Sequence, residues 1–508
     1  QEFLKRRGYD VHKYMPAMLG RVVGSADVSD RFLWDVRKTQ AELMNENYYG
    51  HFAELCRQHG MRAYIEPYDP GNFDEMSTGA FADIPMGEFW LGQVNHHSVK
   101  LAASVAHVNG KAVVAAESFT GQTKWQEHPY CMKTLGDFMY TQGLNNYVFH
   151  RFAHQPHPDV APGMTMGPWG WSFDRTNTWF EKAGAWLKYV ARAQNLLRQG
   201  LFVADLLYFT GEDSPVVAPG LAQLNPPPPP GHDWDTIDAG AIQTRIKIEN
   251  GRIVLADGMS YRVLVLRDNT KLSLALLQRL RDLVSQGMWL VGPKPAESPS
   301  LADNDAEVRR LAAEVWGDLN GTTITERAFG KGRVFWGQPL GAVLDKLNLK
   351  PDFEFTSRSG DAPINWIHRR AGDADLYFVA NRSRRSEDLV CTFRVSGKQP
   401  EFWDAVTGGI AKAATCEIAD GRTRVPIRLE PAGSIFVVFR SPAPARRMVA
   451  IAKDGATIVS AGSFTKAGPG LHRKVADNFT ISVWVKPDME TAIPAVGAGP
   501  GGLAAFLR

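Results

Sequence analysis

Four side chains that can give or accept a proton each end, or nearly end, a short apolar run between Arg62 and Phe152. With their runs they are Glu66 (RAYIE), Glu88 (ADIPMGEFW), Glu117 (KAVVAAES) and His150 (NNYVFH). A carboxylic acid that protonates a departing oxygen, paired with a carboxylate that attacks a sugar or activates water, can hydrolyse a glycosidic bond. These residue types therefore indicate glycoside hydrolysis, provided that the fold brings the side chains together.

Glu117 is the leading candidate for the catalytic carboxylate. It directly follows VVAA, so a rigid strand end would hold it in place, as preorganised catalysis requires. An ion pair with Lys or Arg is the structural alternative. Glu88 precedes Phe89 and Trp90, and three roles stay open for it: acid, metal ligand or ion-pair partner.

The polar and aromatic residues in and beside the same runs are candidates for binding a sugar. They are Tyr64, Glu66, Trp90, His150, Arg151 and His154. Glu66, with Tyr64 and Tyr68 close by, can hold sugar hydroxyls or can simply pack. A histidine after a strand can bind substrate or can be a hydrogen-bonded core group, and both interpretations stay open.

Trp169, Trp171 and Asp174 lie in a loop rich in Gly, Pro and aromatic residues, APGMTMGPWGWSFDR, which follows the last of these runs. Loops that follow the strands of a barrel line its mouth. Because an indole ring presents a large flat apolar surface, we expect this loop to form stacking walls for a sugar or, equally, a packed lid.

Segments rich in helix formers separate the four runs, and they close on Gly110 and Gly143, where a helix C-terminus favours glycine. This β–α alternation predicts a parallel sheet with helices outside it. In a (β/α)8 barrel the carboxyl ends of all strands face one mouth, where the active site lies. We therefore expect the candidate side chains to converge there.

Residues 1–60 read as helices, with Asp27 or Ser29 as the expected cap of a long helix that ends at Gly60. Its apolar stripe, expected to pack against a sheet, consists of Phe32, Val36, Leu43, Tyr48, Phe52 and Leu55. Four strands cannot close a barrel of eight, so we expect the first half of the barrel upstream of Gln1.

The remaining sequence predicts further domains. Residues 1–200 would be the C-terminal half of the barrel. Residues 201–352 begin with LFVADLLYFTG, expected as one strand, and alternate apolar runs with helical patterns, so they would form a smaller open α/β domain of flavodoxin or amidotransferase type. Short alternating runs predict an antiparallel β-sandwich over 353–440. Residues 441–476 read as a linker, and 477–508, with NFTISVWVKP, as the start of a truncated laminin-G-like sandwich.

The composition excludes several classes of protein. The formal net charge is +3, from 57 basic and 54 acidic residues, which leaves no surplus for binding nucleic acid. No uncharged apolar run approaches the roughly 20 residues of a membrane-spanning helix. The four cysteines, Cys56, Cys131, Cys391 and Cys416, lack metal-site spacing and are expected to be buried free thiols.

Several of these motifs resemble glycoside hydrolase family 106, the α-L-rhamnosidases, over roughly residues 1–440. They are NENYYGHFAELCRQHGMRAYIEPY, DIPMGEFW, AAESFTG and GMTMGPWGWSFDRTNTWF. The resemblance implies a (β/α)8 catalytic domain, inverting hydrolysis of terminal α-L-rhamnosides in plant or microbial glycans, and Ca²⁺ dependence. It also implies a periplasmic or extracellular location for the full-length protein. By position, Glu117 would be the general base and Glu88 a carboxylate near the calcium ion.

The resemblance also implies a missing group. In the family the general acid is a glutamate in a DSxE-type motif at the end of the fourth barrel strand, which would lie upstream of Gln1. We therefore expect the 508 residues alone to be inactive and the parent protein to be active.

Two alternatives remain open. A retaining β-galactosidase-like hydrolase of the same barrel clan would use the glutamate of the seventh strand as a nucleophile. A non-catalytic carbohydrate-binding protein would bind sugar through its sandwich domains. Oxidoreductases and kinases are excluded, because no glycine-rich nucleotide fingerprint stands in the required strand–helix context.

Overall fold

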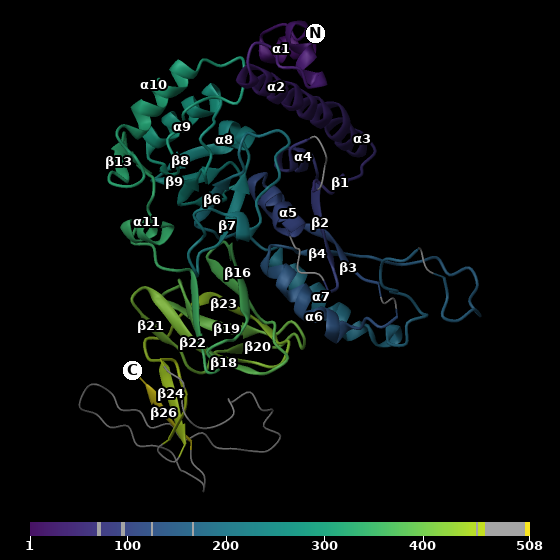
Figure 1. The fold of residues 1–508 in the computed structure, drawn as a ribbon. Helices are drawn as coiled ribbons and strands as arrows, with labels where there is room; N and C mark the ends of the chain where they lie inside the picture. The colour runs from purple at the N-terminus through teal and green to yellow at the C-terminus, as the bar shows by residue number, and fades with distance from the viewer. Residues whose placement is uncertain are drawn as a thin grey trace. The chain divides into compact units, whose positions relative to one another are not determined.

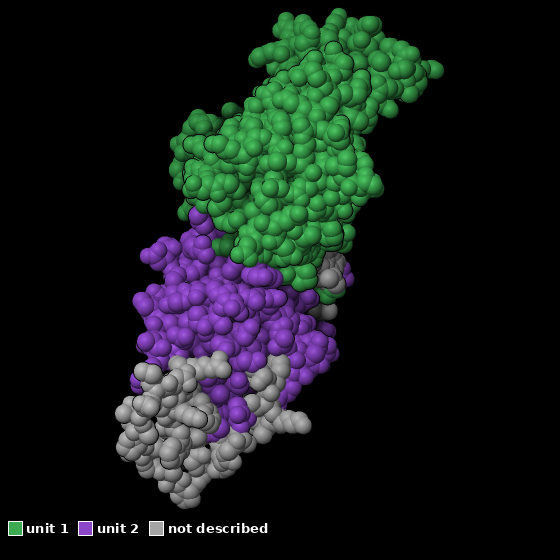
Figure 2. All heavy atoms as spheres, turned by 90° about the vertical axis from the view of Figure 1, so that its left-hand side faces the viewer, with its two compact units in different colours: residues 1–120, 142–150, 203–349 green, residues 121–141, 151–202, 350–508 purple. Residues whose placement is uncertain are grey.

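A computed structural model describes residues 1–68, 73–92, 97–122, 125–164, 167–453, 456–462 and 503–507. The chain divides into two compact units, which Figure 2 shows in different colours. Unit 1 consists of Gln1–Thr120, Gln142–His150 and Val203–Leu349. Unit 2 consists of Gly121–Thr141, Arg151–Phe202 and Lys350–Arg508.

The first sheet of unit 1 is parallel, with the strands in chain order (Figure 1). Its strands are β1 (Tyr64–Ile65), β2 (Ile84–Trp90), β3 (Ala115–Thr120) and β4 (Asn146–Phe149). Between them along the chain lie α4 (Glu75–Gly79) and α5 (His97–Val108), and α5 contacts both β2 and β7 (Trp234–Ile237). The predicted β–α alternation is confirmed, and α5, apolar on most sides, is buried along almost its whole length.

The N-terminal segment is helical, as predicted. It contains α1 (Glu2–Arg7), η1 (His12–Leu19), α2 (Ala26–Met44), η2 (Asn45–Gly50) and α3 (His51–Gln58). The cap of α2 is Ser25 and not the predicted Asp27 or Ser29. The Ser25 hydroxyl accepts the Val28 N–H at 3.1 Å, whereas the Ser29 hydroxyl is used within the first turn.

The predicted apolar stripe of this segment is buried only in part. Phe32 is fully buried, but Tyr48, Phe52 and Leu55 are 59%, 46% and 40% exposed. The reason is η2, a π-helical segment whose wider turn takes the following residues out of phase with a 3.6-residue stripe. The buried residues of α3 are instead Ala53 and Cys56.

The second sheet of unit 1 has the order β13-β14-β12-β11-β6-β7, in which only β13 is antiparallel. The parallel strands, numbered along the chain, therefore stand in the order 2-1-3-4-5 of a flavodoxin-like sheet. Besides β7, its strands are β6 (Leu206–Phe209), β11 (Val263–Val265), β12 (Trp289–Val291), β13 (Glu326–Phe329) and β14 (Gly332–Phe335). The predicted small open α/β domain is confirmed.

Helices and a small meander complete this domain. They are η4 (Leu221–Gln223), α8 (Ala239–Arg245), α9 (Leu274–Gln286), α10 (Asp305–Trp316), α11 (Leu340–Lys346), β8 (Ile246–Glu249), β9 (Arg252–Leu255) and β10 (Ser260–Tyr261). α11 packs its leucine and valine side chains into a core with β6, β11 and β14. α9 contacts both α8 and α10.

Unit 2 contains an antiparallel β-sandwich, as predicted, with sheet orders β15-β18-β22-β21 and β20-β19-β23-β17-β16-β5. The strands are β5 (Leu201–Phe202), β15 (Phe353–Ser357), β16 (Ile364–Ala371), β17 (Ala374–Asn381), β18 (Glu387–Phe393), β19 (Lys398–Trp403), β20 (Ile410–Lys412), β21 (Glu417–Ala419), β22 (Arg422–Leu429) and β23 (Ser434–Pro442). The helices are α6 (Pro129–Thr141), η3 (Phe180–Lys182) and α7 (Gly184–Leu197).

Three expectations differ from the structure or fall outside it. LFVADLLYFTG, expected as one strand, splits between β5 of unit 2 and β6 of unit 1. The expected linker contains β24 (Met448–Lys453) and β25 (Ala456–Ser460), which form a sheet with β26 (Leu503–Leu507). NFTISVWVKP lies outside the described residues.

The cysteines and the membrane expectation can be compared directly with the structure. All four cysteines are free thiols; Cys131 is half-buried and the other three are buried. Within the described ranges, no helix combines the length and the apolar character needed to span a bilayer.

Candidate functional site

Glu66, Glu88 and Glu117 gather at the carboxyl ends of β1, β2 and β3 in unit 1. Glu88 and Glu117 are register partners on neighbouring parallel strands, so their side chains leave the sheet side by side. The Tyr68 hydroxyl lies within reach of both Glu66 and Glu88, and its single proton can be donated to either carboxylate. Partial removal from water, with the negative charges of Glu117 and Glu88, raises the pKa of Glu66, against the hydrogen bond from Tyr68.

Glu117 contacts a hydroxyl and an imidazole. The Thr120 hydroxyl donates to Glu117 Oε1 at 2.9 Å and lies 3.1 Å from His150 Nδ1, which is itself 3.4 Å from Oε1. The Glu117 side chain keeps 27% of its surface exposed. In the described part of the chain it forms no ion pair with Lys or Arg, the arrangement that a purely structural role had predicted.

A β-bulge at the end of β3 makes this contact with Thr120 possible. The register with β2 shifts after Phe89, which pairs with Ser118, so that Trp90 pairs with Thr120. Phe119 falls between these two register pairs with φ 65°, a left-handed conformation that costs a bulky residue on the order of 1–3 kcal/mol. On a regular strand, residues 117 and 120 would face opposite sides of the sheet; the extra residue returns Thr120 to the side of Glu117.

Aromatic packing holds the bulge in place. Phe119 is buried, with ring centroids 4.8 Å from Phe89 and 5.0 Å from Tyr147. Such edge-on ring pairs stabilise by about 0.5–1.5 kcal/mol each beyond the area that they bury. The strained backbone is therefore offset by the strands on both sides of β3.

Glu88 is positioned from the side of α5. The Ser98 hydroxyl accepts the Glu88 N–H at 3.0 Å and donates to the Glu88 carbonyl at 2.8 Å. The preceding residue, Gly87, lies so close to α5 that a Cβ there would be 2.6 Å from the backbone of Ser98. Only glycine fits this approach without a shift of the helix.

The other predicted binding residues of unit 1 border the carboxylates. His150 contacts Thr120, as described, and the half-buried Trp90 is the register partner of Thr120 on the neighbouring strand. Tyr64 is 46% exposed on the edge strand β1.

Five further predicted residues belong to unit 2, and the structure separates them into two groups. Trp169 is 53% exposed, His154 is exposed and Arg151 is half-buried, so all three remain accessible to a ligand. Trp171 and Asp174 are each only 1% exposed.

For Trp171 and Asp174 the structure favours the packed-lid interpretation of the loop over a sugar-stacking wall. Trp171 stacks on Trp179 at 5.7 Å within an aromatic cluster, so its faces already have partners. Asp174 accepts hydrogen bonds from the Thr176 backbone and from Gln155, which holds the loop together. Their neighbour Trp169 is the residue of this loop that presents an indole ring to solvent.

The carboxylate cluster does not by itself form a complete metal site. Among the described residues, no three His, Cys, Asp or Glu side chains are grouped so that they could hold a metal ion. Ca²⁺ requires six to eight oxygen ligands. Glu88 could therefore supply only one ligand of a set that the described residues do not complete.

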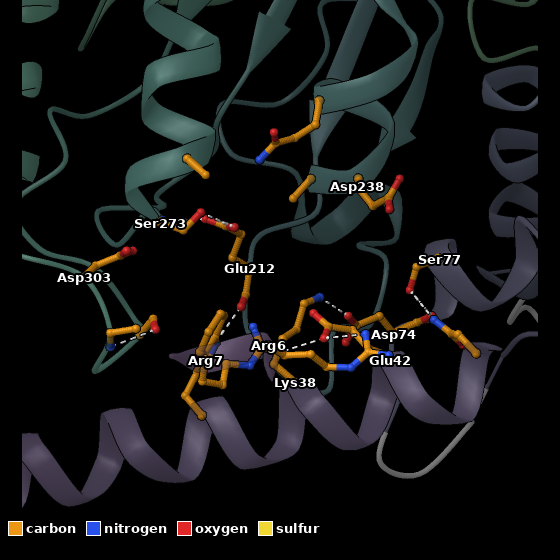
Figure 3. A pocket seen from close by; sticks show the side chains of 18 of the residues that line it. Arg6, Arg7, Lys38, Glu42, Asp74, Ser77, Glu212, Asp238, Ser273 and Asp303 are labelled. Carbon is orange, nitrogen blue, oxygen red and sulfur yellow. Dashed lines mark hydrogen bonds and ion pairs between the residues drawn. The ribbon is translucent and has the colours of Figure 1, made fainter. Parts of the chain in front are cut away.

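Unit 1 also contains a cavity of about 540 Å³ away from these carboxylates (Figure 3). It lies beside the loops that follow β6, β7 and β12, at the sheet edge where doubly wound domains bind ligands. Its charged lining includes Lys38, Glu42, Asp74, Glu212, Asp238 and Asp303. Burial raises the pKa of Glu212 and of Asp238, because the charge of Lys38 only partly offsets it.

At this edge of the sheet, side chains of the protein itself accept the hydrogen bonds that a bound ligand could accept. The Glu212 carboxylate accepts the N–H and the hydroxyl of Ser273, and Asp303 accepts the N–H of Leu274, so internal carboxylates cap α9. Here a doubly wound domain would otherwise bind phosphate.

Helix α2 docks on the same loops. The Trp34 indole donates to the Glu212 carbonyl, and the Arg31 guanidinium donates to the Ser300 carbonyl. Asp35 accepts the Ser300 hydroxyl and the Leu301 N–H. This edge of the second sheet therefore binds helix α2 of the N-terminal segment.

Thr120 and Ser98 are the site residues that sequence reasoning missed. A threonine three positions after a glutamate in a strand is expected on the opposite face, so only the bulge reveals it. Ser98 stands ten residues after Glu88 at the start of a helix, and no local pattern links the two.

Known proteins resemble this chain in sequence and in fold. The model of glycoside hydrolase family 106, described as alpha-L-rhamnosidase, matches residues 1–416. A curated protein of Formosa agariphila, named "Putative beta-glucuronidase", is 39% identical over 460 residues, 89% of this chain and 38% of that protein. The chain thus spans well under half of that relative's length.

Two solved structures resemble this chain in fold. The rhamnosidase from Novosphingobium sp. PP1Y is 32% identical with a TM-score of 0.80, over 89% of this chain and 45% of its own. A catalytic mutant of Gan42B, a GH42 beta-galactosidase from G. stearothermophilus, is 12% identical with a TM-score of 0.53, over 86% of this chain and 75% of its own. The second likeness shows the fold alone.

Proposed function

This chain belongs to glycoside hydrolase family 106, and from that we propose that it is part of an inverting hydrolase of terminal α-L-rhamnosides in plant or microbial glycans. The observation that carries the proposal is the gathering of Glu66, Glu88 and Glu117 at neighbouring strand ends, with Glu117 open to solvent and held by Thr120 and His150. Its location would be periplasmic or extracellular.

In this mechanism Glu117 is the general base. Its carboxylate takes a proton from a water molecule while the water oxygen bonds to the anomeric carbon. The bond from that carbon to the glycosidic oxygen breaks, and the departing oxygen takes a proton from a carboxylic acid outside this chain. Glu66, Tyr64, Trp90 and His150 are the residues of unit 1 proposed to bind the sugar, and Arg151, His154 and Trp169 of unit 2 stay candidates from the sequence.

The rest of the barrel would cover surfaces that unit 1 leaves exposed. Tyr48, Phe52 and Leu55 form an exposed apolar stripe on η2 and α3, and Tyr64 is exposed on the edge strand β1. All-parallel sheets are normally covered on both faces and leave no bare edge strand. We propose that further β–α units of a longer protein pair with β1 and pack on this stripe, which completes a (β/α)8 barrel.

Calcium dependence is part of the proposal for the longer protein. Glu88 would donate one carboxylate to the ion, and the remaining oxygens would come from outside the described residues. Bound Ca²⁺ would orient sugar hydroxyls and offset the negative charge of the neighbouring glutamates.

The test compares the longer protein, the 508-residue chain and a single substitution. We expect the longer protein to release rhamnose from p-nitrophenyl α-L-rhamnoside and Glu117→Gln to lower kcat by about 10²–10⁴-fold, because the general base is lost. The 508-residue chain alone should be inactive. Activity of that chain, or of Glu117→Gln at the unsubstituted rate, would contradict the proposal.

A glucuronide is the second candidate substrate, because of the named function of the relative from Formosa agariphila. Rhamnose is neutral, whereas a glucuronide carries a carboxylate, which Glu66, Glu88 and Glu117 would repel wherever no bound Ca²⁺ offsets their charge. Parallel assays with p-nitrophenyl glucuronide decide between the two. A retaining, β-galactosidase-like mechanism is tested by a fluorinated glycoside, which would label Glu117 covalently only if Glu117 is a nucleophile.

A further inference from the structure

We propose that Thr120 is the positioning residue of Glu117, and that by holding Oε1 it leaves Oε2 as the atom that takes the proton from water. The proposal rests on the role of Glu117 as general base. It assigns to His150 a supporting contact through Thr120 in addition to any contact with a sugar.

The Thr120 hydroxyl has a single proton to donate. An ionised carboxylate only accepts hydrogen bonds, so the single hydroxyl proton points to Glu117 Oε1, at 2.9 Å. The hydroxyl oxygen then has to accept from His150 Nδ1, at 3.1 Å. These two hydrogen bonds place the ring proton of His150 on Nδ1, and both bonds are directed toward Glu117.

The hydroxyl is fixed by packing and not by a ligand. Thr120 is fully buried, and its β-branched side chain has few rotamers to choose from. The bulge that turns it toward Glu117 is clamped by Phe119, whose ring packs between those of Phe89 and Tyr147. The hydrogen bond is therefore in place before substrate binds, as preorganisation requires.

The two carboxylate oxygens of Glu117 differ as a result. Oε1 receives the hydroxyl of Thr120 and lies 3.4 Å from His150. Oε2 has no hydrogen-bond partner among the described residues, and the side chain is 27% exposed. A water molecule that attacks the anomeric carbon would give its proton to Oε2.

Substitutions at Thr120 separate the hydroxyl from the shape of the side chain. Thr120→Val keeps the shape and removes the hydroxyl, and in the longer protein we expect kcat to fall by about 10–100-fold with KM changed less than about threefold. Thr120→Ser keeps the hydroxyl and should restore kcat to within about threefold. Thr78→Val, which removes the equally buried Thr78 hydroxyl and its bond to Asn45, is the matched control and should leave kcat unchanged.

A second measurement does not depend on hydrolysis. In the 508-residue chain labelled with ¹⁵N-histidine, we expect His150 to be the Nδ1–H tautomer in the unsubstituted and Thr120→Ser proteins. Thr120→Val should give a mixture of tautomers, because the oxygen that accepts from Nδ1 is gone.

The outcomes are distinguishable. Unchanged kcat and an unchanged His150 tautomer in Thr120→Val would overturn the positioning role. A loss of kcat that Thr120→Ser does not restore, or that Thr78→Val reproduces, would also overturn it. If the longer protein releases no rhamnose at all, the proposed function fails, and the tautomer measurement alone decides whether Thr120 holds His150 and Glu117 together.

Discussion

Gly87 is the residue of the candidate site at which an added Cβ should change stability most. A Cβ on residue 87 would lie 2.6 Å from the Ser98 backbone, and Ser98 holds both backbone groups of Glu88. We expect Gly87→Ala to lower the free energy of unfolding by about 1–3 kcal/mol, because α5 must move away from β2. Urea denaturation followed by tryptophan fluorescence measures the change.

The control for this substitution is Gly341→Ala in α11 of the same unit. Gly341 has ordinary helical backbone angles and no heavy atom within 4 Å of an added Cβ. Alanine there should raise the free energy of unfolding by about 0.4–1 kcal/mol, because the unfolded chain loses freedom. Equal effects at the two positions would show that close packing at Gly87 is not the cause.

At the scale of residues, the sequence predicted the carboxylates well and their neighbours poorly. Glu66, Glu88 and Glu117 lie at or near the ends of apolar runs, and parallel strands bring their carboxyl ends to the same edge of the sheet. Thr120 depends on a bulge, and bulges arise from packing that is distant in sequence. A buried and an exposed indole look alike in a loop sequence, so the sequence left open whether Trp171 stacks on a sugar or packs within the loop.

Helix α2 carries Lys38, one of the cations that line the cavity of Figure 3. Lys38 pairs with Asp74 and faces Glu212 and Asp238, and these charges outweigh burial and raise the pKa of Lys38. We expect Lys38→Met to lower the free energy of unfolding at pH 7 by about 3–5 kcal/mol, because buried carboxylates lose their counter-charge. Urea denaturation at pH 7 and pH 5 measures it.

The loss of free energy of unfolding caused by Lys38→Met should be smaller at pH 5 than at pH 7. The pKa values of Glu212 and Asp238 are raised by burial, so in the folded protein these groups take up protons as the pH falls toward their folded values, and the uncompensated charge is reduced. Lys346→Met is the control, since Lys346 pairs with Glu326 at the surface and should change stability by less than about 1 kcal/mol. A defect that grows at pH 5 would contradict this account.

At the scale of elements, the sequence predicted regular strands and helices but missed irregular ones. The β–α alternation of the first sheet has a strong period, so β1 to β4 and α5 were predicted with their order. The stripe that runs through η2 was predicted with a constant helical period, and the π-helical turn breaks that period. LFVADLLYFTG was read as one strand because both halves are apolar, although they pair with different sheets.

The pH dependence of the whole chain should have a component from the sandwich of unit 2. His368 is fully buried between Asp352 and Asp375, at 2.8 and 3.1 Å. Burial alone would lower the pKa of His368, but the two aspartates outweigh it and raise the pKa. Burial would likewise raise the pKa of Asp375, but hydrogen bonds from His368 and Lys398 lower it.

The directions of these two pKa shifts define the pH range in which unit 2 is most stable. The contribution of His368 is complete below its unfolded pKa of about 6.5 and is lost as the pH rises through the folded value. The contribution of Asp375 is complete above its unfolded pKa of about 3.9 and is lost as the pH falls. Unit 2 should therefore be most stable between about pH 4 and pH 6.5.

Calorimetry over pH 4–9 checks this window. The transition of unit 2 should move to lower temperature above about pH 6.5, with a slope of at most about 1.4 kcal/mol per pH unit from one proton. His368→Gln, which does not titrate, should be less stable throughout and should lose that slope. The same slope in His368→Gln would assign the effect to another group.

At the scale of the whole molecule, the resemblance of the motifs predicted the family, and the sequence order suggested consecutive domains. The structure instead interleaves its two units, because residues 121–141 and 151–202 cluster with the sandwich of residues 350–442. Contacts between segments that lie hundreds of residues apart leave no periodic signal, so no local pattern could have shown this division.

The hydrogen bonds between α2 and the loops of the second sheet have a consequence for recombination between related genes. A recombination that replaced residues 203–349 alone would exchange Ser300 and Glu212 while it left behind Arg31, Trp34 and Asp35, which bond to them. Buried donors and acceptors would then face foreign loops. Successful exchanges between relatives should therefore carry residues 26–44 together with 203–349, and the two segments should be inherited as one block although 158 residues separate them in the sequence.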